Sequence, residues 1–81
     1  MLWIRTQNAH NLISCHDINV AGKDVTGKYF AADNYFALLG TYESKKRALA
    51  ILDCIQEHIN NYEWSTTHGV YHSRVYNMPE Y

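Results

Sequence analysis

Several features that define protein classes are scarce in this 81-residue sequence. Two cysteines are too few for the disulfide framework of a small secreted domain. A formal net charge of -1 supplies no overall positive field, so we expect no nucleic-acid partner. No apolar run approaches the roughly 18 residues of a membrane span, and residues 1–7 lack the apolar stretch of a signal peptide. We therefore expect a cytoplasmic protein with no membrane partner.

Glycine-rich and nucleophile motifs are also missing. The four glycines are isolated from one another, so they form neither a phosphate-binding loop nor a dinucleotide fingerprint. There is no Gly-x-Ser-x-Gly elbow and no cysteine-protease signature. These absences favour a protein that is not an enzyme and that uses no cofactor.

Aromatic residues are the most abundant unusual feature of the chain. Hydrophobic residues make up 47% of it and charged residues 19%, as in an ordinary globular domain, and the length predicts one domain over residues 1–81. Seven Tyr, two Trp and two Phe exceed what one small core encloses. Tyr and Trp at a surface favour contact areas, so we expect a homo-oligomer or an aromatic surface that faces a ligand.

Alternation of apolar and polar residues predicts strands in the first half of the chain and near its end. They are expected at residues 2–6, 12–15, 18–20, 25–31, 35–42 and 70–76. Polar turns separate them at residues 7–11 and 21–24 and at Asp33 and Asn34, because Asn and Asp tolerate tight turns. The predicted fold is α+β: a small antiparallel meander of about four to five strands, with one amphipathic helix on one face and a C-terminal strand.

Helical periodicity begins at Ser44 and predicts a helix over residues 44–62. The apolar residues on one stripe are Ala48, Ile51, Leu52, Ile55, Ile59 and Tyr62. Polar residues 64–69, which end at Gly69, predict a loop after the helix. The stripe is expected to pack on the sheet and to stabilise the fold.

Cysteine and histidine residues offer one arrangement with metal-binding chemistry. Cys54 and His58 would share a helix face, and Cys15 and His16 would add two donors from the sheet, which suits tetrahedral zinc. The spacing matches no zinc-finger pattern, and a cysteine beside an apolar stripe behaves as a small hydrophobe. We therefore predict no metal site.

Three cations occupy the predicted first turn of the helix: Lys45, Lys46 and Arg47. The helix dipole disfavours positive charge there, and acidic residues are usual. Free N–H groups and basic side chains together form a phosphate-binding arrangement. The alternative is that Glu43 or another carboxylate neutralises the cations in solvent.

The predicted C-terminal strand carries a second polar group. His72, Arg74 and Tyr76 would share one strand face, and Tyr71 would lie on the other. Arginine grips phosphate and tyrosine stacks on a base, so this strand is a candidate for ligand contact. The alternative is an edge strand kept soluble by polar side chains.

Three segments resemble short proteins encoded by phages and mobile elements of Gram-positive bacteria. They are WIRTQN at residues 3–8, LGTYESKKRA at residues 39–48 with Ile51, Leu52, Asp53 and Ile55 following, and VYNMP at residues 75–79. The pattern is also similar to that of the Thoeris anti-defence sponge proteins, which phages use to sequester cyclic ADP-ribose-type immune signals.

The resemblance implies a non-catalytic oligomer that binds an anionic cyclic nucleotide between protomers, through arginines and aromatics, and releases it unchanged. The candidate contacts come from local chemistry: Lys45, Lys46, Arg47, Tyr71, Arg74 and Tyr76. The alternative function is a phage protein that inhibits a host defence effector by direct protein–protein contact, which the aromatic excess also favours.

Overall fold

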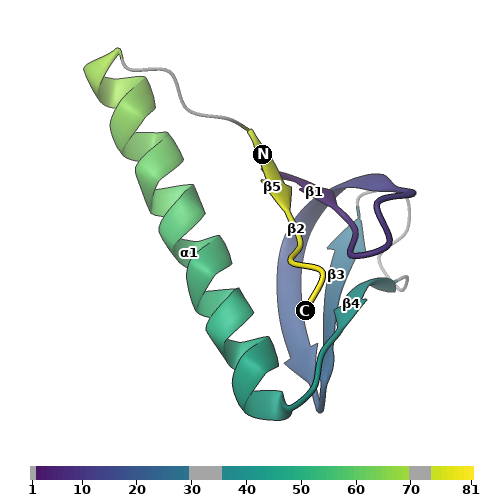
Figure 1. Cartoon of the computed structure of the whole chain (residues 1–81). Coiled ribbons are helices and arrows are strands. Elements are labelled where there is room, and N and C mark those ends of the chain that lie inside the picture. Colours follow the sequence, from purple (N-terminus) through teal and green to yellow (C-terminus); the bar gives the residue numbers. More distant parts are fainter. Residues whose placement is uncertain (1, 30–35, 70–73) are drawn as a thin grey trace.

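The described part of this computed structural model comprises residues 2–29, 36–69 and 74–81, in which four strands precede one helix and one strand follows it (Figure 1). The elements are β1 (Leu2–Arg5), β2 (Leu12–Ala21), β3 (Asp24–Tyr29), β4 (Phe36–Thr41), α1 (Lys45–His68) and β5 (Val75–Asn77). The predicted α+β class and its C-terminal strand are confirmed. The predicted turn at Asp33 and Asn34 and the first part of the predicted last strand, residues 70–73, lie outside the described residues.

The five strands form one sheet in the order β4-β3-β2-β1-β5. Neighbours from β4 to β1 are antiparallel, as the meander predicts, whereas β5 runs parallel to β1 with Trp3 opposite Val75. The sheet is therefore mixed. Parallel neighbours need a crossover connection, and α1 provides it by returning the chain from the β4 side to the far edge of β1.

Strand β2 is continuous where the sequence pattern predicts two short strands. Its pairing with β3 shifts register between Cys15 and Asp17, which marks a β-bulge. Side chains alternate along a strand, so Cys15 and Ile18 would face opposite sides without an extra residue. The bulge lets Cys15, Ile18 and Val20 all pack against the core.

Gln7, which follows β1, closes part of the free edge of β4. Its backbone N–H donates to the Leu39 carbonyl (2.8 Å), and its side-chain amide donates to the Thr41 carbonyl (3.0 Å). The Thr41 N–H donates in turn to Gln7 Oε1 (2.8 Å). The sheet thus curls until the end of β1 meets β4, and one glutamine takes the place of a neighbouring strand.

The core lies between the sheet and the first half of α1. The buried hydrophobic side chains are Ile4, Cys15, Val25, Leu39, Tyr42, Ala48, Ile51, Ile55 and Met78. The predicted stripe is thus buried at Ala48, Ile51 and Ile55, but Ile59 is 37% exposed. Figure 1 shows the reason, because the helix diverges from the sheet toward its C-terminal end.

Helix α1 continues to His68, so the loop predicted over residues 64–69 is wrong for residues 64–68. Ser and Thr are moderate helix formers rather than breakers, and this stretch contains no proline. Gly69, with φ of 74°, follows the last helical residue. A glycine in this left-handed conformation is a common helix C-terminus.

Candidate functional site

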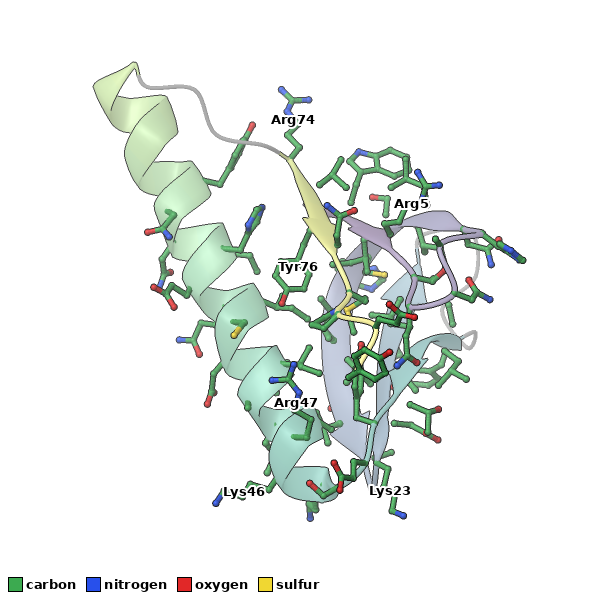
Figure 2. All side chains as sticks on the ribbon, viewed as in Figure 1. Arg5, Lys23, Lys46, Arg47, Arg74 and Tyr76 are labelled. Carbon is green, nitrogen blue, oxygen red and sulfur yellow. The ribbon has the colours of Figure 1, made fainter. Side chains whose placement is uncertain are left out.

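The first turn of α1 is built around Ser44. Its hydroxyl accepts a hydrogen bond from the Arg47 N–H (3.1 Å), and its carbonyl accepts one from the Ala48 N–H (3.1 Å). Ser44 is therefore the N-cap, and the helix begins one residue later than predicted, at Lys45. The first turn contains no acidic residue, and the Lys45 and Lys46 side chains are exposed. Figure 2 shows Lys46 pointing away from the sheet.

Arg47 differs from the two lysines because its guanidinium has a partner within the chain. Its Nε and one terminal nitrogen donate to the main-chain oxygen of Tyr81, at 3.1 and 2.8 Å. Arg47 and Tyr81 help to line a hollow of about 440 Å³, together with Gln7, Thr41, Tyr42, Glu43 and Glu80. Of the three cations in the first turn, Arg47 thus anchors the C-terminal segment.

Two tyrosines lie within electrostatic reach of Arg47. The Tyr42 hydroxyl donates to the Pro79 carbonyl (2.9 Å), and burial, reinforced by Tyr76 and opposed by Arg47, raises its pKa to about 12. Burial also raises the pKa of Tyr76, with Cys54 adding to the rise and Arg47 reducing it. Both hydroxyls therefore stay protonated at neutral pH.

Arg74, which immediately precedes β5, and Tyr76 on β5 both face α1. The Arg74 Nε donates to the Tyr62 hydroxyl (2.9 Å), and the Tyr76 ring meets His58 edge-on, with ring centroids 5.4 Å apart. Figure 2 places Tyr76 between β5 and the helix, and Arg74 at the end of the molecule opposite Lys46. Arg74 thus lies just before the strand rather than on it, and both Arg74 and Tyr76 contact helix side chains.

The five predicted contacts that the structure describes do not converge within one chain. From Arg47 to Tyr62, where Arg74 is bound, the helix rises by about four turns, or roughly 22 Å. Arg47 is close enough to Tyr76 to reduce the rise in its pKa. Arg74 lies further along the helix, at Tyr62. Tyr71 lies outside the described residues.

The cysteines and histidines do not form a donor cluster in the described ranges. No group of three or more His, Cys, Asp or Glu side chains is placed there to hold a metal ion. Cys15 is buried in the core, and burial raises the pKa of its thiol, whereas Cys54 is exposed on the helix. Cys15 therefore serves as a core residue. The interpretation of Cys54 as a small hydrophobe beside the apolar stripe is wrong, because Cys54 is exposed.

Two residues that shape this region, Gln7 and Tyr42, are not among the candidates predicted from the sequence. Gln7 also donates to the Glu80 carbonyl (2.8 Å), so it holds the C-terminal segment as well as β4. The sequence contains one signal for Tyr42, which is the glycine at position 40 within β4. In the structure a Cβ added at Gly40 would lie 2.7 Å from the Tyr42 hydroxyl. A glycine within a strand marks such close approach.

No family model, curated protein or solved structure matches the chain. Across residues 2–29, 36–69 and 74–81, no helix combines the length and hydropathy that a membrane span requires.

Proposed function

We propose that this protein binds an anionic nucleotide of the cyclic ADP-ribose type and holds it without chemical change, as a phage anti-defence sponge in the host cytoplasm. One observation carries the proposal: Lys45 and Lys46 are exposed on a first turn that contains no acidic residue. Helix N-terminal N–H groups, the positive end of the dipole and two ammonium groups favour a phosphate there.

The surroundings restrict the direction from which the phosphate approaches. Glu43 and Glu80 line the hollow beside Arg47, so their carboxylates oppose an anion on that side. Lys45 and Lys46 lie on the solvent side of the turn. We therefore place the phosphate against the two lysines, with Arg47 as structural support.

The separation of the candidate residues favours a ligand held between protomers. Roughly 26 Å along the helix separates Lys45 from Tyr62, which binds Arg74, and this is more than one small nucleotide spans. Lys45 and Arg74 can thus contact the same nucleotide only if they come from different chains. The proposed sponge is therefore a homo-oligomer.

Isothermal titration calorimetry of the purified protein against a panel of cyclic nucleotides, including cyclic ADP-ribose, tests this function. We expect saturable binding, and chromatography after heat denaturation should return the nucleotide unmodified. Paired Lys45→Gln and Lys46→Gln substitutions should weaken binding by about 3- to 30-fold.

Lys28→Gln is the matched control, because Lys28 lies on β3, where its ammonium is 5.3 Å from the centre of the Phe36 ring. It should leave the affinity unchanged. Absence of heat with every nucleotide in the panel refutes the proposed function. An equal loss with Lys28→Gln refutes the role of the helix start.

A second candidate function is direct inhibition of a host defence protein. The observation that favours it is the exposure of large apolar side chains on β4, where Phe36 is 52% and Leu38 is 56% exposed. Exposed apolar side chains that lie together mark interaction surfaces. Pull-down from host lysate should then recover one stoichiometric protein, and Phe36→Asp should abolish recovery; a retained nucleotide with no protein would exclude it.

A further inference from the structure

A slot opens on the sheet face turned away from α1. Trp3 and Ser14 are paired across β1 and β2, and their neighbours Ile4 and Cys15 are buried in the core, so Trp3 and Ser14 point outward. The slot has a volume of about 540 Å³, and we call it the Trp3 slot. Its lining includes Trp3, Asn11, Leu12, Ser14, Ala37 and Leu38.

The walls of the Trp3 slot are apolar although they face solvent. Trp3 is 38%, Leu12 51% and Leu38 56% exposed. The outer face of an antiparallel sheet is normally polar, so this face departs from the usual pattern. None of the slot residues within the described ranges carries a charge, and the volume falls in the range of small-molecule sites.

Ser14 brings an unsatisfied hydroxyl group to the lining of the slot. Its Oγ is buried and has no hydrogen-bond partner among the described residues. A buried hydroxyl without a partner is destabilising and calls for a specific reason. Asn11 brings a side-chain amide, which can donate and accept hydrogen bonds, to the same slot.

We propose that the Trp3 slot binds a neutral, planar heteroaromatic ring of about the size of a purine. The indole of Trp3 supplies a stacking surface, and Leu12 and Leu38 enclose the ring edge. Asn11 pairs with the ring's nitrogen or carbonyl atoms, and rotation about χ1 brings the buried Ser14 hydroxyl into the slot as a second partner. The absence of charge in the described lining selects a neutral ring rather than a phosphate, so this site is separate from the lysines at the start of α1.

Tryptophan fluorescence with adenosine as the probe tests the proposal. The sequence has two tryptophans, so Trp64→Phe leaves Trp3 as the reporter. Adenosine should quench Trp3 saturably in this variant. Leu38→Arg in the same background blocks the slot and should weaken binding by about 5- to 150-fold, the range expected for loss of one stacked base.

Leu49→Arg is the matched control, because Leu49 is 43% exposed on α1, outside the slot. It should leave the adenosine affinity unchanged. Ser14→Ala should weaken binding several-fold. As a measurement that does not depend on Trp64→Phe, the Trp3 indole N–H resonance of the unmodified protein should shift with adenosine.

Three results would overturn the proposal. The first is linear, unsaturable quenching by adenosine together with an unmoved Trp3 resonance. The second is equal affinity in the Leu38→Arg and Leu49→Arg variants. The third is a change of oligomer mass caused by Leu38→Arg alone, because the slot would then be covered by a second copy. Loss of cyclic nucleotide binding in the Lys45 and Lys46 variants leaves adenosine binding intact, so the two sites are tested separately.

Discussion

Gly27 on β3 offers a sharp test of the packing between the sheet strands. A Cβ built at this position lies 2.7 Å from the Cys15 Sγ, 3.3 Å from the Cys15 Cβ and 3.3 Å from the Leu39 Cδ1. A methyl group cannot approach sulfur to 2.7 Å, so Gly27→Ala must displace a buried side chain. The expected sign is destabilising, although alanine is generally favoured over glycine within a strand.

The loss of unfolding free energy can be estimated from the contact with the Cys15 sulfur and from the two 3.3 Å contacts. Overpacking of a filled core by one methyl group costs about 1 to 3 kcal/mol. Cys15→Ala removes the sulfur and leaves a small cavity, at a cost of about 1 kcal/mol. In the double variant only the 3.3 Å contacts persist, so Gly27→Ala should then cost less than about 0.5 kcal/mol. The coupling free energy between the two substitutions is therefore about 0.5 to 3 kcal/mol.

Urea unfolding followed by circular dichroism measures all four stabilities of this double-mutant cycle. Gly22→Ala is the control, because Gly22 has φ of 60° and nothing within 4 Å of an added Cβ. It should cost about 1 kcal/mol through backbone strain alone, equally in the parent and in the Cys15→Ala background. Equal stability of Gly27→Ala and the parent, or an unchanged cost after Cys15→Ala, would refute the steric account.

Three further predictions concern the helix and the residues that hold the C-terminal segment. Arg47→Ala should lower the free energy of unfolding by about 1 to 2 kcal/mol, and Lys46→Ala by less than about 0.5; equal effects in urea melts would contradict the anchoring role. Folding favours the neutral Tyr42 hydroxyl, with its pKa near 12 rather than 10, so stability falls above pH 10 as the unfolded chain ionises first. By pH 11 Tyr42→Phe should avoid about 1 kcal/mol of that loss. Urea melts of the parent and of Tyr42→Phe at pH 9 and pH 11 would disprove this if the two proteins lost stability equally. Ile55→Asp should abolish the far-ultraviolet helical signal, whereas Ile59→Asp should retain it. Unfolding by both substitutions would show that the Ile59 side chain is as important to the core as that of Ile55.

The start and the buried stripe of α1 were predictable from the sequence because they depend on local chemistry. The Ser44 hydroxyl and the spacing of Ile51 and Ile55 act within one or two turns. The end of the helix was not predictable from periodicity. Toward its C-terminal end the helix diverges from the sheet, so no continued apolar stripe is needed there and polar residues fit the last turns.

The sheet was predictable in its strands but not in their arrangement. Alternation places Cys15 and Ile18 on opposite faces, and the bulge that reconciles them has no composition signal of its own in this stretch. The sequence likewise left undetermined whether β5 runs parallel or antiparallel, because the residues of a short apolar strand do not specify which strand it pairs with. Pairing of Trp3 with Val75 is decided by where α1 delivers the chain.

The candidate site was predictable as a group of cations but not as a set of separate roles. Lys45, Lys46 and Arg47 are adjacent and equivalent in charge in the sequence. Arg47 is distinguished only by Tyr81, which lies 34 residues away along the chain. Contacts over such separations, like the one between Tyr42 and Pro79, leave no periodic pattern that a single sequence reveals.

The two amide groups of the Gln7 residue have a consequence for folding kinetics. The backbone amide binds Leu39 of β4, and the side-chain amide also binds Glu80, which is 73 residues away in the sequence. The contacts that complete the sheet are therefore among the longest in the chain, and loop closure must precede them. We expect α1 and the β2–β3 hairpin to form early and the contacts of Gln7 with β4 and the C-terminal segment to form last. Substitutions of Gln7 should then speed unfolding while leaving the folding rate nearly unchanged.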